Sequence, residues 1–216
     1  MELVLLGPPG SGKGTQAKVL AERFQVPHIS TGDIFRKNLS EGTELGQLAR
    51  HYMDQGLLVP DDVTEAMVKD RLGQADAQPG FILDGFPRNV AQGEHFQEML
   101  REAGRSLSAV IHLVVRRDVL IARLTGRRVC PACGATYHLQ FSPPKVAGHC
   151  DVCGTELVQR PDDSLETVTR RLEVFDNETA PLVAFYQEQG LVLDFDGEMA
   201  VGALTDAIAS RVSARG

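Results

Sequence analysis

The glycine-rich start of the chain, residues 1–15 (MELVLLGPPGSGKGT), constrains the fold more than any other segment. An apolar run of strand length at 2–6 leads into a loop with one lysine, and residues 12–24 repeat apolar side chains at helical spacing. A strand, a G-x-x-x-x-G-K loop and a helix in this order predict a P-loop. Such a loop turns backbone N–H groups toward an anion, the helix dipole adds positive potential, and Lys13 supplies a full charge for β- and γ-phosphates. The alternative is a glycine-rich turn that opens an ordinary strand–helix unit.

The position of the hydroxyl residue narrows the type of P-loop. The common motif carries Ser or Thr directly after the lysine, whereas this chain has Gly14 there and Thr15 one residue later. In this respect the loop resembles that of nucleoside monophosphate kinases more than those of motor ATPases or GTPases. We expect the triphosphate to contact Gly10, Ser11, Gly12, Lys13, Gly14 and Thr15.

Length and charge exclude several classes of protein. A chain of 216 residues suits one large α/β domain, or a core with small insertions. The net charge of −7 argues against a general nucleic-acid binder, and the sequence holds no apolar run long enough to span a bilayer. Because no leader-like segment precedes the first strand, we expect a cytoplasmic protein without membrane or nucleic-acid partners.

Strands and helices alternate along the rest of the chain. After the first strand, strand-like segments occur at residues 27–30, 81–84, 109–115 and 191–195, and helical patterns lie between them. One helical pattern runs from Ile34 to about Ser40, and another begins at Asp61 and Asp62, which suit the first turn of a helix. Pro181 should kink or break the helical pattern of residues 164–189. This alternation predicts an α/β P-loop fold of three layers, with a central parallel five-stranded sheet covered on both faces. Residues 30–59 and 126–163 look like insertions near the carboxyl ends of strands, where ligands bind in such sheets.

All four cysteines lie in the second insertion, as Cys130, Cys133, Cys150 and Cys153. The spacing C-x2-C-x16-C-x2-C falls in the range for a zinc site of four thiolates, and each pair is followed by a glycine that lets the backbone turn. Four thiolates leave no open position, so the metal should be structural. The alternatives are two disulfides, which a cytoplasmic chain disfavours, or four free thiols. His138 and His149 are close enough in sequence to be considered, but with four cysteines available we expect them to be bystanders.

Further motifs complete a family resemblance. Thr31-Gly32-Asp33, then Asp84-Gly85-Phe86-Pro87-Arg88 with Gln92, then Gly126-Arg127-Arg128 with the later Arg160 and Arg171, follow the P-loop in the order found in adenylate kinases. The cysteines make the chain look like the long form of that family, whose lid binds zinc. The resemblance implies a core (residues 1–29, 60–125 and 164–216), an AMP-binding segment (residues 30–59) and a zinc-binding lid (residues 126–163).

The resemblance also implies roles for single residues. AMP would contact Thr31, Arg36, Leu57, Leu58, Val59, Gly85, Phe86, Pro87, Arg88, Gln92, Arg160 and Arg171. Besides the P-loop, ATP would contact Arg123, Arg127, Thr136, Tyr137 and the main chain near Met199, which stands where some relatives have lysine. The catalytic set would be Lys13, Arg88, Arg123, Arg160, Arg171 and Asp84, with Asp84 supporting Mg²⁺ through water. We also expect Asp162 and Asp163 to pair with the arginines of the site when the lid closes.

The residues themselves agree with this implication. Phosphoryl transfer needs little covalent help, because an AMP phosphate oxygen is already ionised; it needs positive charge and the exclusion of water. We therefore expect a monomeric enzyme that catalyses MgATP + AMP ⇌ 2 ADP and maintains adenine nucleotide balance. One alternative is a related nucleoside monophosphate kinase with another acceptor or a GTP donor. A more distant alternative is a zinc-ribbon adaptor that uses ATP as a switch.

Overall fold

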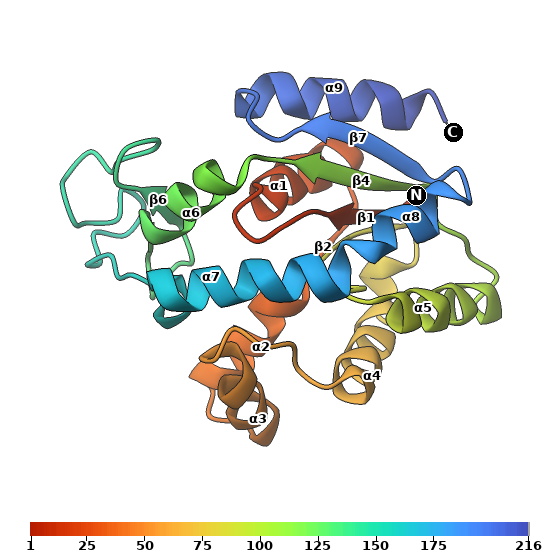
Figure 1. Cartoon of the computed structure of the whole chain (residues 1–216), viewed down its shortest axis with the longest axis horizontal. Helices are drawn as coiled ribbons and strands as arrows, with labels where there is room; N and C mark the ends of the chain where they lie inside the picture. The colour runs from red at the N-terminus through yellow and green to blue at the C-terminus, as the bar shows by residue number, and fades with distance from the viewer. Residues whose placement is uncertain (216) are drawn as a thin grey trace.

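The computed structural model describes residues 1–215. In this part of the chain the centre is a five-stranded sheet in the order β2-β3-β1-β4-β7, and all its strand pairs are parallel (Figure 1). The strands are β1 (Glu2–Leu6), β2 (His28–Ser30), β3 (Phe81–Asp84), β4 (Ala109–Val114) and β7 (Val192–Asp196). The predicted five-stranded parallel sheet is confirmed.

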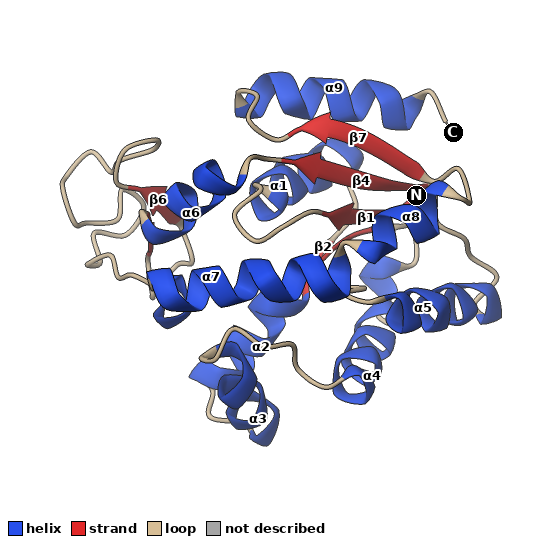
Figure 2. Cartoon of the chain, in the orientation of Figure 1, coloured by secondary structure: helices blue, strands red, loops and turns tan. Residues whose placement is uncertain are grey.

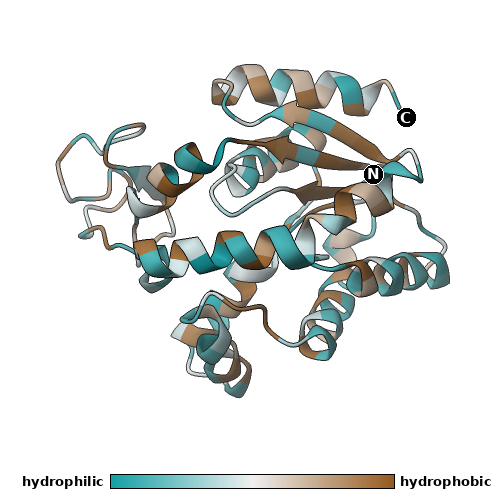
Figure 3. Ribbon diagram, viewed as in Figure 1, coloured by the Kyte–Doolittle hydropathy of each residue, from teal (hydrophilic) through white to brown (hydrophobic). Residues whose placement is uncertain are grey.

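Strand β1 shows why these strands read as continuous apolar runs. Successive side chains of a strand point to opposite faces, so both faces must be apolar if both are covered. Leu3 and Leu5 pack in one buried cluster, whereas Val4 and Leu6 pack in the other. Figure 3 shows the strands as the most hydrophobic ribbons of the molecule.

Helices cover both faces of the sheet (Figure 2). The first cluster lies under α1 (Lys13–Phe24) and α9 (Val201–Ser213). The second lies under α4 (Asp61–Leu72), α5 (Val90–Glu102) and α8 (Pro181–Gln187). A short 3₁₀ helix, η1 (Ala75–Ala77), leads from α4 toward β3. This arrangement is the expected set of three layers, helix on sheet on helix.

The helical pattern of residues 164–189 folds as three consecutive segments. Helix α7 (Leu165–Val174) runs into a π-helical turn, η3 (Phe175–Thr179), and then into α8. The Ala180 N–H reaches back five residues to the Phe175 carbonyl (2.8 Å). Pro181, which has no N–H to donate, is the first residue of α8. The predicted break at Pro181 is confirmed.

The first insertion contains α2 (Thr31–Ser40) and α3 (Glu44–Met53). The sequence predicted that α2 would begin at Ile34, but it begins three residues earlier. The reason is local, because the Ser30 side chain accepts a hydrogen bond from the Asp33 N–H (3.2 Å) and so caps the helix at that point. Phe35, Ala49 and Val59 form a small core of their own in this segment.

The second insertion follows α6 (Arg117–Thr125) and projects from the ends of the strands, at the left of Figure 1. Strands β5 (Arg127–Val129) and β6 (Thr136–His138) pair antiparallel, and a 3₁₀ turn, η2 (Pro161–Asp163), leads into α7. Within residues 1–215, no helix is both long and apolar enough to cross a membrane.

Candidate functional site

The sequence-predicted residues meet at one edge of the sheet. The P-loop follows β1, Thr31 follows β2, and residues 85–88 follow β3. Because neighbouring parallel strands end on the same side, these segments converge at the carboxyl edge, which is the usual ligand position in open α/β sheets. In Figure 2 the arrowheads of β4 and β7 point toward this edge and toward the second insertion.

The P-loop leaves the start of α1 open for an anion. Gly12 precedes α1 with φ +96°, a left-handed conformation that glycine adopts without strain, and no side chain caps the helix. The first N–H groups of α1 therefore have no capping acceptor and can bind phosphate. Lys13 Nζ donates to the carbonyls of Gly7 (2.7 Å) and Pro8 (3.0 Å), so the loop carbonyls already orient the ammonium.

The charge of Lys13 is held in an unfavourable environment. Burial lowers its pKa to about 8, against the attraction of Asp84, and the nearby Arg88, Arg171 and Arg127 lower it further. An anionic ligand would remove this penalty, because its negative charge favours the ammonium form.

Several arginines near Lys13 also have lowered pKa values, and burial is again the main cause. Burial and the charge of Arg171 lower the pKa of Arg88 to about 10, although Asp84 opposes them. Burial, Arg36 and Arg127 lower the pKa of Arg160 to about 10, and burial is also the main cause of a lowered pKa at Arg171. These guanidinium groups remain charged at neutral pH, so the site holds a standing positive potential that suits phosphate groups.

Acidic side chains neutralise part of this potential. Arg127 donates two hydrogen bonds to Asp163 (2.8 and 2.5 Å), and Arg171 lies 3.0 Å from Asp162 and 3.3 Å from Asp163. Burial alone would raise the pKa of Asp162, but Arg171 and Arg127 lower it overall. Asp162 and Asp163 therefore pair with Arg127 and Arg171 in this structure.

Arg36 is held by a neighbour in its own helix. Its Nη2 lies 2.6 Å from the Asp33 carboxylate, and this arginine outweighs the effect of burial, so the pKa of Asp33 is lowered.

Arg88 and Thr31 come together through Gly85. Arg88 Nε and Thr31 Oγ1 both donate to the Gly85 carbonyl, at 2.7 and 2.9 Å. The Thr179 hydroxyl of the π-helical turn donates to the Arg88 carbonyl (2.6 Å) and so fixes this arginine from a distant part of the chain. Sequence reasoning missed Thr179, because its only local signal is a polar residue two positions before a proline.

The Gln92 side chain is buried and bonded to the protein. Its Nε2 donates to Asp61 (2.6 Å), and its Oε1 accepts from the Arg88 N–H (2.8 Å). Asp61 was predicted only as a residue of the first helical turn, and no sequence signal marks its contact with a residue 31 positions away. Of the predicted connector residues, Val59 is buried, whereas Leu57 and Leu58 are half-buried.

On the other side of the P-loop, Arg123 lies against the β7–α9 loop. Its Nη1 donates to the Gly197 carbonyl (2.9 Å), and the Gly197 N–H donates to the Val114 carbonyl (2.8 Å). Met199, in the same loop, is exposed. Arg123 therefore contacts Gly197, which lies two residues before Met199, the position predicted to meet the ATP base.

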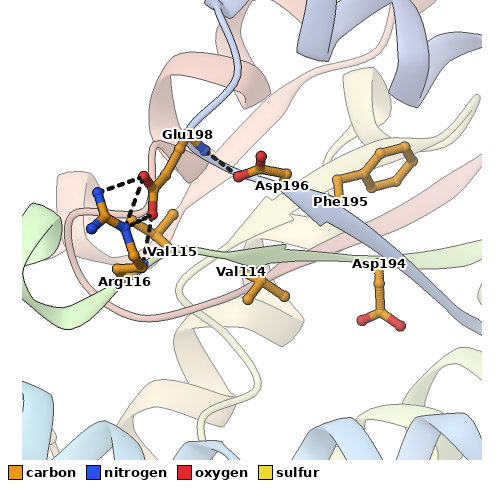
Figure 4. Close-up of a pocket in the computed structure, with 7 residues that line it drawn as sticks. All are labelled: Val114, Val115, Arg116, Asp194, Phe195, Asp196 and Glu198. Carbon is orange, nitrogen blue, oxygen red and sulfur yellow. Dashed lines mark hydrogen bonds and ion pairs between the residues drawn. The ribbon is translucent and has the colours of Figure 1, made fainter.

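A shallow cavity of about 370 Å³ lies beside the same loop (Figure 4). Its lining residues are Val114, Val115, Arg116, Asp194, Phe195, Asp196 and Glu198. Figure 4 shows Arg116 and Glu198 joined by hydrogen bonds at its rim, while Val114 and Asp194 point the same way from neighbouring strands. None of the arginines of the phosphate-binding region lines this cavity.

The four cysteines converge within the second insertion. Their sulfur atoms all lie within 4.8 Å of one another, with Cys130–Cys153 at 3.4 Å and Cys133–Cys150 at 3.5 Å. Tetrahedral zinc with Zn–S bonds of about 2.3 Å would separate the sulfurs by about 3.8 Å. The donor set and its geometry therefore fit a zinc ion held by four thiolates.

The backbone around the cysteines forms two matching turns. The Cys130 N–H donates to the Ala135 carbonyl and the Cys150 N–H to the Thr155 carbonyl, both at 2.9 Å. The predicted bystander role of the histidines agrees with their contacts: His138 Nε2 lies 3.0 Å from the Ala122 carbonyl and His149 Nδ1 lies 3.1 Å from the Ala147 carbonyl.

The two predicted nucleotide contacts of this insertion differ in exposure. Thr136 is exposed on β6. Tyr137 is buried against Cys150, and its hydroxyl accepts a hydrogen bond from the Asp151 N–H (2.8 Å). The Tyr137 side chain is therefore part of the core of the insertion.

Comparison with known proteins gives consistent matches. The family model described as "Adenylate kinase" matches residues 5–191. A protein named adenylate kinase from Clostridioides difficile is 56% identical over 208 residues, which cover 96% of both chains. A protein of the same name from Caldanaerobacter subterraneus is 56% identical over 96% of this chain and 94% of that protein. Another, from a Thermoanaerobacter species, is 52% identical over the full length of both chains.

Proposed function

The chain belongs to the adenylate kinase family, and on that premise we propose which of its residues carry out reversible phosphoryl transfer from MgATP to AMP. The reaction gives two ADP and maintains the balance of adenine nucleotides. The observation that carries the proposal is the convergence of the P-loop and a cluster of charged arginines at one edge of the sheet.

The donor side consists of the P-loop and the residues next to it. Backbone N–H groups at Gly10, Ser11, Gly12, Gly14 and Thr15 would bind the ATP phosphates, with Lys13 on the β- and γ-phosphates. Support for the position of the base comes from Arg123, which already holds the loop next to Met199.

The acceptor side is assigned to the segment after β2 and the turn after β3. Arg36 and Arg88 would bind the AMP phosphate, and Thr31 and Gln92 would lie beside the adenine. The remaining pocket residues are Leu57, Leu58, Val59, Gly85, Phe86 and Pro87. Support comes from the shared Gly85 carbonyl, which brings Thr31 and Arg88 to one place.

Catalysis would rest on positive charge placed between the two phosphate chains. Charge spreads over the transferring phosphoryl group in the transition state, so preorganised cations stabilise that state more than the ground state. Lys13, Arg88, Arg123, Arg160 and Arg171 would supply this charge. The ion pairs of Arg171 with Asp162 and Asp163 hold that guanidinium in place before substrate binds.

Magnesium would enter with ATP and neutralise part of the phosphate charge. Asp84 is the residue to hold its water ligands, because its carboxylate ends β3 beside the P-loop and already attracts the Lys13 ammonium.

Residues 126–163 would act as a lid that covers ATP, brings in Arg127, Thr136 and the backbone of Tyr137, and excludes water. Residues 30–59 would form the AMP-binding segment, and residues 1–29, 60–125 and 164–216 the core. We assign a structural zinc ion to Cys130, Cys133, Cys150 and Cys153, because four thiolates leave no position for substrate.

The proposed assembly and compartment follow from the same site. One chain supplies every charged group of the cluster, so a monomer would be complete. We place the protein in the cytoplasm, a reducing compartment in which four clustered cysteines suit a metal site better than disulfides.

The test is an initial-rate screen in which MgATP is mixed with AMP, UMP, CMP or GMP and the nucleoside diphosphates are separated and counted. We expect AMP to be the preferred acceptor, with two ADP formed for each ATP consumed. Preference for another monophosphate, or hydrolysis of ATP without transfer, would contradict the proposal. Replacing ATP with GTP in the same assay tests the donor.

A further inference from the structure

The Gln92 amide lies in a closed hydrogen-bond network between the first turns of α4 and α5, two helices that lie near each other in Figure 1. Its Nε2 donates to Asp61 Oδ1 (2.6 Å), and its Oε1 accepts from the Arg88 N–H (2.8 Å). Asp61 Oδ2 accepts from Asn89 Nδ2 (2.9 Å), and Asn89 Oδ1 caps α5 by accepting from the Gln92 N–H (2.8 Å). Both oxygens of Asp61 are therefore occupied by amide donors.

This network fixes which end of the Gln92 amide is oxygen and which is nitrogen. A carboxylate can only accept hydrogen bonds, and a backbone N–H can only donate. Turning the amide by half a turn would place oxygen against the Asp61 carboxylate and N–H against the Arg88 N–H. Gln92 is only 1% exposed, so water could not compensate for the two lost bonds.

The fixed amide leaves one donor and one acceptor available to a nucleotide base, and their order is fixed. A glutamine amide has two N–H groups and two acceptor positions, and the network uses one of each. Adenine presents an N6–H donor beside the N1 acceptor, whereas a 6-oxopurine presents an O6 acceptor beside an N1–H donor. The two bases therefore require opposite orders of donor and acceptor.

We propose that Asp61 is a positioning residue that sets the specificity for the acceptor base, because it holds the Gln92 amide in the orientation that pairs with adenine and rejects 6-oxopurines. The proposal rests on the function proposed above, in which Gln92 lies beside the AMP base. Asp61 acts through Gln92 and does not itself touch the nucleotide.

Replacing Asp61 with asparagine tests the proposal, because asparagine keeps the shape but has one acceptor in place of two. Asn89 cannot turn, since its own oxygen caps α5. One donor must then face another donor in either orientation of Gln92, so the two orientations become similar in energy. The matched control is Asp62→Asn, which removes the same charge from the same helical turn at an exposed position.

The measurement is kcat/KM for AMP and for inosine monophosphate, a 6-oxopurine nucleotide, with saturating MgATP. We expect the ratio of the two values to fall about tenfold or more in Asp61→Asn, the size of one lost hydrogen bond. KM for ATP should stay unchanged, and Asp62→Asn should keep the wild-type ratio. The ratio does not depend on the fraction of folded enzyme, so partial unfolding cannot imitate the result.

An Asp61→Asn enzyme that loses activity equally with both nucleotides would overturn the proposal, because that is the effect of a structural role alone. A fall of the same size in Asp62→Asn would also overturn it, since it would assign the effect to charge. If Asp61→Asn does not fold, Asp61→Ser, which likewise lacks the second carboxylate oxygen, provides the same ratio. Failure of the proposed function is a distinct result: the wild-type protein would then give no ADP from ATP and AMP, and the inference would fall with it.

Discussion

Among single residues, Lys13 meets two opposing demands. It must be charged for the proposed binding of phosphate, yet burial, together with the nearby Arg88, Arg171 and Arg127, lowers its pKa to about 8. The carbonyls of Gly7 and Pro8 hold the ammonium in place before any ligand arrives. The folded protein thus holds a cation in surroundings that disfavour it, and an anionic substrate would relieve that cost.

The substitution Lys13→Ala should lower kcat by about 10²–10³ because it removes a preorganised charge that acts on the transition state. The melting temperature should not fall, because the ammonium is unfavourable in the free protein. Steady-state rates and thermal melts check both statements. The control is Lys18→Ala on the exposed side of the same helix, which should leave the rate unchanged. Near-normal activity in Lys13→Ala would contradict the P-loop assignment.

The lowered pKa of Lys13 has a second consequence, for proton uptake. Between a pH of about 8 and the ordinary lysine pKa of 10.5, the unfolded chain binds this proton and the folded protein does not, so stability should rise with pH across that range.

Phosphate binding favours the charged amine, so ATP binding at pH values above about 8 should take up a proton. The phosphates of ATP are fully ionised there and supply no competing signal.

Calorimetry of ATP binding at a pH near 9, in buffers that differ in ionisation enthalpy, measures this uptake. We expect an uptake that approaches one proton in the wild-type protein and disappears in Lys13→Ala. An uptake of zero in the wild-type protein would show that Lys13 stays charged in the free protein.

Among the elements of the fold, those with a local signal could be predicted from sequence. The P-loop, the apolar strands and the cysteine pairs each depend on residues a few positions apart. The strand order and the hydrogen bond between Asp61 and Gln92 depend on contacts between distant segments, so no local pattern predicts them. The start of α2 was missed because a single side chain, Ser30, decides it.

The insertion that carries the cysteines is an element with little core of its own. Its buried cluster consists of Cys130, Tyr137, Cys150 and Leu157, with Ala135 packed against it, whereas Leu139 and Phe141 are 56% and 62% exposed. So small a core cannot offset the conformational entropy of the segment, and we infer that the metal supplies much of its folding free energy.

The double substitution Cys130→Ser with Cys133→Ser should therefore release zinc and lower the melting temperature. Some phosphoryl transfer should survive at low temperature, where ATP can still order the insertion. Metal analysis, thermal melts and cold activity test this, with His149→Ala as a control that should keep its zinc. Wild-type protein without stoichiometric zinc would contradict the structural role. A folded, zinc-free and wholly inactive variant would point to a chemical role instead.

At the scale of the whole molecule, charge is distributed unevenly. The chain carries a net charge of −7, yet its carboxyl edge gathers Arg88, Arg160, Arg171 and Lys13. These groups come from the first helix, the turn after β3 and the two sides of η2, so the fold is what brings them together. Local motifs indicated the individual residues, but the burial and mutual repulsion that lower the pKa values of Arg88 and Arg160 are properties of the folded chain.

The central claim is that this one cluster serves two phosphate chains, with the two nucleotides bound head to head. Calorimetric titration with a molecule that joins two adenosines through five phosphates tests it most directly, because that molecule fills both sites and carries the bridging charge. We predict one molecule bound per chain, with an affinity about a hundredfold or more above that of ATP or AMP alone. Two molecules bound per chain, or an affinity no better than that of ATP, would contradict a shared site.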